Sequence, residues 1–190
     1  MSSTQTDEKL QTVAFSTNNT TQTPNTTIKI FLSKYTHTII KESKHVISFL
    51  TKLPNSEEQK KILVCSVLKL EKEYTGVKDV NCYIMFVNIE EKESIERLND
   101  IIAYFIKYYD DSKKIFLIRF FKNSNNINLT MEEWSGILED NHLQYEYKQI
   151  NLEKKYEVEK IFLEMLDYST KHPIKGFVKS INDAKSCFIF

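Results

Sequence analysis

Short apolar runs alternate along the chain with segments in which apolar residues recur every three or four positions. Near-continuous apolar runs are typical of strands buried on both faces of a sheet, and the three-to-four spacing is typical of a helix with one buried side. The predicted strands are 28–32, 61–68, 82–89, 114–121 and, as an edge strand, 143–150. The predicted helices are 39–53, 93–109, a short helix from Thr130, and 153–169. This order predicts an α/β fold in which helices cover both faces of a mostly parallel sheet.

The two ends of the chain differ from this alternating part. Residues 1–27 are rich in Ser, Thr, Gln and Asn, and their few apolar residues include Leu10, Val13 and Phe15. So little apolar surface does not offset the entropy lost on ordering, so we expect a disordered N-terminal tail. The rest divides into one domain at 28–170 and a flexible C-terminal tail at 171–190.

Composition excludes several classes of function. The 26 basic and 26 acidic residues cancel, so no net field attracts nucleic acid. Three scattered cysteines and four scattered histidines give neither a disulfide framework nor metal-ligand spacing. Since the chain has no signal-peptide core and no apolar run of about 20 residues, we expect a cytosolic protein.

The last four residues, Cys-Phe-Ile-Phe, form a C-a-a-X ending. A terminal Phe is typical of sequences that receive a geranylgeranyl group, here on Cys187, and predicts a prenyltransferase as a partner. One prenyl chain holds a membrane only weakly, and Lys171, Lys175 and Lys179 add attraction to anionic lipid. We therefore expect a cytoplasmic protein reversibly anchored to the cytosolic face of a membrane. In the alternative, the Phe-Ile-Phe segment packs on the folded domain.

A family resemblance rests on three short sequence segments, on the order of the elements and on the C-a-a-X ending. Phe-Val-Asn-Ile at 86–89, Lys-Glu-Ser-Ile at 92–95 and Val-Glu-Lys-Ile-Phe at 158–162 resemble the fourth strand, the following helix and the C-terminal helix of the Ras superfamily of small GTPases. The resemblance implies a P-loop NTPase-like fold, here with a shortened switch region because only residues 53–61 are available for it. It also implies a nucleotide site between the first strand and the first helix.

The nucleotide motifs of that family are degenerate in this chain. Its phosphate loop, G-x-x-x-x-G-K-[ST], falls on 33–40, where Ser33 and Thr38 replace the glycines, Ile39 the lysine and Ile40 the magnesium-binding hydroxyl. Side chains at glycine positions block the approach of backbone N–H groups to phosphate, and Ile39 supplies no ammonium group. The base-reading N-K-x-D falls on 121–124 and keeps only Lys122.

The resemblance and the lost motifs predict a Ras-like pseudo-GTPase. It would be prenylated and membrane-tethered, and would act in signalling or trafficking by binding protein partners, with no catalytic residue, metal or nucleotide cofactor. In the first alternative it is an active but divergent small GTPase, which binds GTP or GDP with magnesium through Lys34, Lys41 and Lys122. In the second it is an unrelated α/β domain with an accidental C-a-a-X-like ending.

Overall fold

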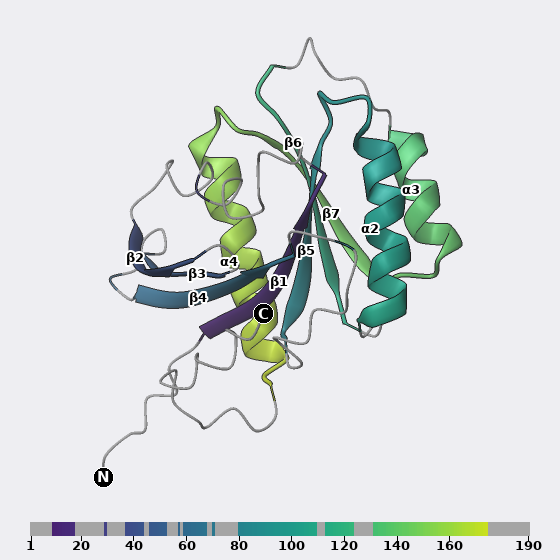
Figure 1. Cartoon of the computed structure of the whole chain (residues 1–190). Helices are drawn as coiled ribbons and strands as arrows, with labels where there is room; N and C mark the ends of the chain where they lie inside the picture. The colour runs from purple at the N-terminus through teal and green to yellow at the C-terminus, as the bar shows by residue number, and fades with distance from the viewer. Residues whose placement is uncertain are drawn as a thin grey trace.

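The computed structural model of this chain describes residues 9–17, 29, 37–43, 46–52, 57, 59–67, 70, 80–109, 113–123 and 131–174. These residues form a seven-stranded sheet in the order β2-β3-β4-β1-β5-β6-β7, with helices on both faces (Figure 1). The strands are β1 (Lys9–Ser16), β2 (His37–Glu42), β3 (Val46–Lys52), β4 (Gln59–Ser66), β5 (Cys82–Asn88), β6 (Ile115–Phe121) and β7 (Tyr145–Asn151).

The sheet is mixed but mostly parallel. Strand β1 pairs in parallel with β4 on one side and β5 on the other, and β6 and β7 continue the parallel half. Strands β2 and β3 form an antiparallel hairpin that pairs with β4. The predicted α/β class with a mostly parallel sheet is therefore confirmed.

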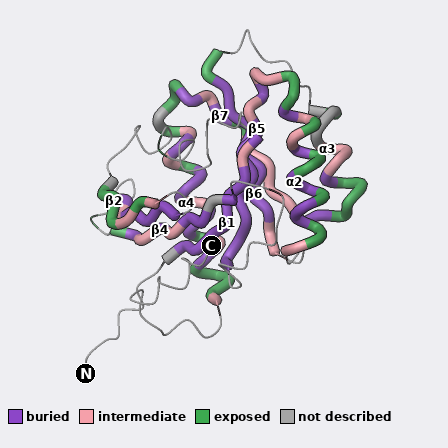
Figure 2. Tube along the Cα trace, in the orientation of Figure 1, coloured by how far each residue is buried: buried purple, intermediate pink, exposed green. Residues whose placement is uncertain are grey.

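Two apolar cores lie on opposite faces of this sheet because successive side chains of a strand point to opposite sides. Helices α2 (Ser94–Tyr108) and α3 (Met131–Asp140) cover one face, and α4 (Lys155–Lys171) covers the other (Figure 1). The central strands are buried along most of their length (Figure 2). Among the described residues, no helix is long and apolar enough to cross a membrane.

Most predicted elements are confirmed with shifted ends. Strands β4, β5, β6 and β7 correspond to the runs at 61–68, 82–89, 114–121 and 143–150, and β7 is an edge strand as expected. Helices α2, α3 and α4 correspond to the predicted helices at 93–109, after Thr130, and at 153–169. These elements have the longest apolar runs or the clearest helical period.

The predicted disordered tail is wrong for Lys9–Ser16, which form the central strand β1. Leu10 and Val13 are fully buried, and Phe15 is 1% exposed. Thr12 is compatible with this buried position because its hydroxyl has a hydrogen-bond partner. The Thr12 hydroxyl donates to the Cys82 carbonyl at 2.7 Å. The domain therefore begins before residue 28. Apart from Lys9–Ser16 and Thr17, residues 1–27 lie outside the described part of the chain.

The predicted helix at 39–53 is also wrong, because this segment forms the β2–β3 hairpin. The backbone N–H of Ser43 donates to the Val46 carbonyl at 2.8 Å and closes the hairpin. The segment is rich in β-branched residues, which favour the pleated conformation over a helix. The predicted first strand at 28–32 lies outside the described residues except for Lys29.

Candidate functional site

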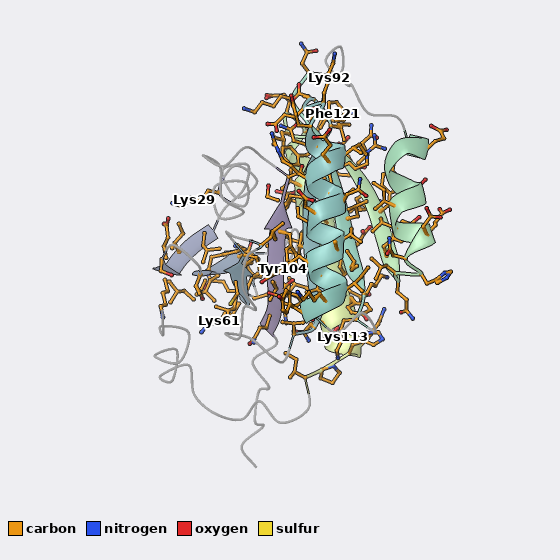
Figure 3. All side chains as sticks on the ribbon, turned by 45° about the vertical axis from the view of Figure 1, so that its right-hand side comes forward. Lys29, Lys61, Lys92, Tyr104, Lys113 and Phe121 are labelled. Carbon is orange, nitrogen blue, oxygen red and sulfur yellow. The ribbon has the colours of Figure 1, made fainter. Side chains whose placement is uncertain are left out.

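The carboxyl ends of the parallel strands meet at one edge of the sheet, which is where open α/β sheets usually bind ligands. Strands β1, β5, β6 and β7 end there at Ser16, Asn88, Phe121 and Asn151. Figure 3 shows Phe121 and Lys92 at this end of the molecule and Lys113 at the other. We call this the carboxyl edge and treat it as the candidate site.

Thr17, directly after β1, is hydrogen-bonded to neighbouring elements through both its backbone and its side chain. Its backbone N–H donates to the Phe86 carbonyl at 2.9 Å, and its hydroxyl accepts from the Asn88 N–H at 3.0 Å. The same hydroxyl lies 3.1 Å from the Ser94 hydroxyl, which donates to the Asn88 carbonyl at 2.6 Å. Thr17 is fully buried. The end of β1 is therefore tied to β5 and to the first turn of α2.

Arg97 of α2 is held by internal acceptors. One guanidinium nitrogen donates to the Thr17 carbonyl and to a Glu91 carboxylate oxygen, the latter at 2.6 Å. The other Glu91 oxygen accepts from the Asn88 side-chain amide at 3.0 Å. The Arg97 guanidinium, which binds the carbonyl directly after β1, is thus neutralised by a carboxylate of the same chain.

Glu90 binds the backbone that follows β6. Its two carboxylate oxygens accept from the backbone N–H groups of Lys122 and Asn123, each at 3.0 Å. Successive backbone N–H groups that converge on one point form a concavity suited to an anion. In this molecule, Glu90 provides that anion.

The structure separates the lysines that the sequence suggested as nucleotide contacts. Lys122 follows β6 at the carboxyl edge, whereas Lys41 lies in β2 at the far edge of the sheet. Five strand spacings of roughly 4.8 Å put these two strands about 24 Å apart, so the two lysines cannot share one phosphate group. Lys34 lies outside the described residues.

The proposed degenerate phosphate-loop positions are not in a loop between a strand and a helix. Thr38, Ile39 and Ile40 belong to β2, and Ser33 lies outside the described residues. In this fold the loop after the first central strand begins after Thr17. Residues 18–28, which follow, lie outside the described part of the chain, but their sequence contains neither glycine nor lysine. The pattern G-x-x-x-x-G-K-[ST] is therefore absent from this segment too.

Sequence reasoning missed Thr17, Glu90, Glu91 and Arg97 as a connected group. They come from three separate segments, and only the parallel pairing of β1, β5 and β6 brings them together. A short apolar cluster at Leu10–Phe15 was the one signal that could have located the end of β1. It was outweighed by the polar composition around it.

The remaining candidate chemistry is limited. Burial raises the pKa of the Cys82 thiol to about 12, so this cysteine is protonated and unreactive at neutral pH. Among the described residues, no group of three or more His, Cys, Asp and Glu side chains could hold a metal ion. Cys187, the predicted lipidation site, lies outside the described residues.

Comparison with known proteins adds no family assignment. The chain matches no protein-family model, and no curated protein sequence is significantly similar to it. The fold class and the geometry of the carboxyl edge are therefore the basis for any statement about function.

Proposed function

We propose that this protein is a Ras-like pseudo-GTPase that is tethered to a membrane by a geranylgeranyl group on Cys187. It acts in signalling or trafficking by binding protein partners, without GTP hydrolysis. One observation carries the proposal: at the carboxyl edge, where such a fold would hold a nucleotide, the Glu90 carboxylate occupies the N–H groups of Lys122 and Asn123.

The placement of the family-like phrases supports the fold part of the proposal. Residues 86–89 end β5 and begin the turn after it, 92–95 lead into α2, and 158–162 lie within α4. The resemblance assigns the first segment to a fourth strand, and it lies instead at the end of the fifth strand along the chain, β5; the other two lie at the start of the following helix and in the last helix, as the resemblance implies. The antiparallel strands beside a parallel half, with helices on both faces, also agree with the expected small-GTPase arrangement.

Electrostatics at the carboxyl edge oppose triphosphate binding. A nucleotide triphosphate needs convergent N–H donors and cations to offset its charge. Here the N–H groups of Lys122 and Asn123 already bind a carboxylate, and Arg97 is paired with Glu91. The resemblance puts the base-reading motif at 121–124, so Glu90 occupies N–H groups beside the expected base position. Glu91, in contrast, neutralises the Arg97 cation at the end of β1, after which the phosphates would lie.

The end of α4 supports a tether on the opposite side. Because α4 runs back along the sheet after β7, it ends at the amino edge, where the Asn81 side chain donates to the His172 carbonyl at 3.1 Å. The segment that carries Cys187 continues from this fixed point. A membrane anchor on Cys187 would therefore be joined to the domain at the amino edge and not at the carboxyl edge.

The nucleotide part is tested on the full chain. Nucleotide that co-purifies is identified by HPLC, and GTP, GDP and ATP are titrated calorimetrically with and without magnesium. We expect no binding. Guanine-nucleotide binding in the micromolar range or tighter would instead establish the divergent-GTPase alternative, and Lys122→Ala would then show whether this lysine contributes.

The tether is tested separately by incorporation of a geranylgeranyl group in a prenyltransferase assay and by location in cells. Cys187→Ser should abolish both incorporation and membrane association, while the neighbouring control Ser186→Ala should leave both intact. If the wild-type chain accepts no prenyl group and Cys187→Ser does not change its location, the chain is an unrelated α/β domain with a fortuitous ending.

A further inference from the structure

The segment that follows α4 has a regular apolar pattern in its sequence. Helix α4 ends at Lys171, and the next carbonyl, that of His172, accepts from the Asn81 side chain at 3.1 Å. The segment therefore starts from a fixed point of the domain. Residues 175–185 lie outside the described part of the chain. Apolar residues recur along the segment with the three-to-four spacing of a helical face, at Ile174, Phe177, Val178, Ile181 and Ala184.

The polar residues of the segment fall on the other side of such a helix. At 3.6 residues per turn, the five apolar positions occupy an arc of about 120°. Lys175 and Lys179 are four positions apart and share the opposite side with Asn182 and Asp183. Three lysines and one aspartate give residues 174–185 a net charge of +2. This combination of an apolar face with Phe and a polar face with Lys is suited to the interface of an anionic membrane.

We propose that residues 174–185 bind an anionic lipid surface as an amphipathic helix that lies in the plane of the membrane. This role deepens the proposed tether and rests on it, because Cys187 follows directly after the segment and its prenyl chain would bring the segment to the membrane. One prenyl chain holds a membrane only weakly, so stable anchoring needs a second signal. The amphipathic segment is that signal.

Pro173 separates the proposed helix from α4. A proline disfavours the helical conformation of the residue before it, and His172 has φ of −127° and ψ of 65°, outside the helical range. Proline is also favoured in the first turn of a helix that follows it. Isolated helices shorter than about 12–15 residues are marginal in water, and Gly176 weakens this one further. We therefore expect the helix to form only when lipid buries its apolar face.

The test is co-sedimentation of the full chain, without a prenyl group, with two kinds of vesicle. One kind contains phosphatidylcholine alone, and the other an equimolar mixture of phosphatidylcholine and phosphatidylserine. We expect the wild-type chain to bind the mixed vesicles more tightly, because they attract the lysines. The helical signal in far-UV circular dichroism should increase as the chain binds.

The matched variant exchanges two neighbouring residues, Val178→Lys/Lys179→Val. It keeps the composition and the net charge, but it places a lysine on the apolar face and a valine on the polar face. It should bind the mixed vesicles about tenfold more weakly, because the continuous apolar face is lost. The control Ile106→Ser, which removes an isoleucine that is 41% exposed on α2, should bind like wild type.

Equal binding of the exchange variant and wild type would overturn the proposal, as would a wild-type chain that binds neither kind of vesicle or binds both equally. Thermal melting without vesicles should give the same midpoint for both chains. A large drop in the exchange variant would mean that the segment packs on the domain, which also overturns the proposal.

The prenyl tether is judged separately from the amphipathic segment. A chain that binds the mixed vesicles as expected but accepts no geranylgeranyl group would refute the tether and leave the segment as a lipid-binding element. A prenylated chain that binds equally well with and without the exchange at 178 and 179 would refute the amphipathic segment and leave the tether.

Discussion

Strands β1 and β6 occupy similar positions in the sheet but look different in the sequence. Every residue of β6 is buried, and the strand reads as an apolar run interrupted by Arg119. Residues 10–15 of β1 are also all buried, yet they include Gln11 and Thr12, which are 4% and 0% exposed. Periodicity alone identified β6 and missed β1.

The difference lies in how each strand satisfies its polar groups. In β1, the Gln11 backbone N–H donates to the Asn81 side-chain oxygen at 2.9 Å, and the Thr12 hydroxyl donates to the Cys82 carbonyl. In β6, the Arg119 guanidinium lies 5.8 Å from the centre of the Tyr147 ring, and burial lowers its pKa. A buried polar residue is tolerated when its partner is in place. The sequence does not show that partner.

The largest expected effect tests whether β1 contributes as much to the stability of the core as β6 does. Phe15 packs edge-to-face on Phe105 and Tyr109, with ring centres 6.1 and 5.4 Å apart. Phe15→Ala should lower the free energy of unfolding by about 3–5 kcal/mol, and Phe116→Ala in β6 should cost a similar amount. Urea denaturation followed by circular dichroism measures both.

Tyr156→Ala is the control for this pair because Tyr156 is 66% exposed, and it should change stability by less than about 0.5 kcal/mol. If Phe15→Ala behaved like this control, residues 9–16 would be peripheral, and the comparison of β1 with β6 would be lost.

A smaller effect tests the partner of the polar residues in β1. Asn81 accepts from the Gln11 N–H and donates its own backbone N–H to the Gln11 carbonyl at 2.9 Å. Asn81→Ala leaves the buried Gln11 N–H without this acceptor, which should cost about 1–3 kcal/mol in thermal or chemical unfolding. Asn81→Asp keeps an oxygen at the same position and, when protonated in acid, also an O–H donor toward the His172 carbonyl, so in acid it should cost less than Asn81→Ala. Equal losses for both variants would assign the effect to packing and not to this bond.

These contacts explain how much of the molecule could be predicted. Strands β5 and β6 and helices α2 and α4 were predictable because their apolar patterns are strong and local. Strand β1 and the β2–β3 hairpin were not, because a polar strand needs partners from distant segments and because β-branched residues at 39–53 also fit a helical spacing. The absence of glycine from residues 1–75 could be read directly from the sequence.

The candidate site was less predictable than the fold. Lys122 was placed correctly at the end of a strand, but nothing in the sequence joined it to Glu90. That contact depends on the register between β5 and β6, in which Asn88 lies opposite Phe120. The two residues lie 32 positions apart, so the strand register, and not their spacing along the chain, brings them together.

The next prediction compares how much the contacts after β1 and after β6 stabilise the fold. Arg97 binds the carbonyl of fully buried Thr17 after β1, whereas Glu90 binds N–H groups after β6 that water can also reach. Arg97→Ala should therefore lower stability by about 1–2 kcal/mol, and Glu90→Ala by about 1 kcal/mol or less. Chemical denaturation of both variants under identical conditions measures the difference.

Arg97→Lys and Glu90→Gln serve as matched conservative changes for these strand ends. Each keeps part of the hydrogen bonding, so each should recover part of the loss. A larger cost for Glu90→Ala than for Arg97→Ala would show that the end of β6, and not that of β1, holds the carboxyl edge together.

The smallest effect concerns β7, the strand beside β6 at the edge of the sheet, which is held by ion pairs. Glu146 of β7 pairs with Lys114 and, at 3.1 Å, with Lys148, which also pairs with Glu164 of α4 at 2.8 Å. The hydrogen bond from Lys114 is the main cause that lowers the pKa of Glu146. A lowered pKa means that this stabilisation is full above the unfolded pKa of about 4.3 and is lost as the pH falls through the folded value. Because these side chains are partly exposed, the contribution is at most about 0.5 kcal/mol.

The free energy of unfolding of Glu146→Gln should therefore lie below that of wild type at neutral pH and converge with it in acid, while exposed Glu153→Gln should track wild type throughout. A difference that persists at low pH would mean that Glu146 stabilises β7 by packing and not by charge.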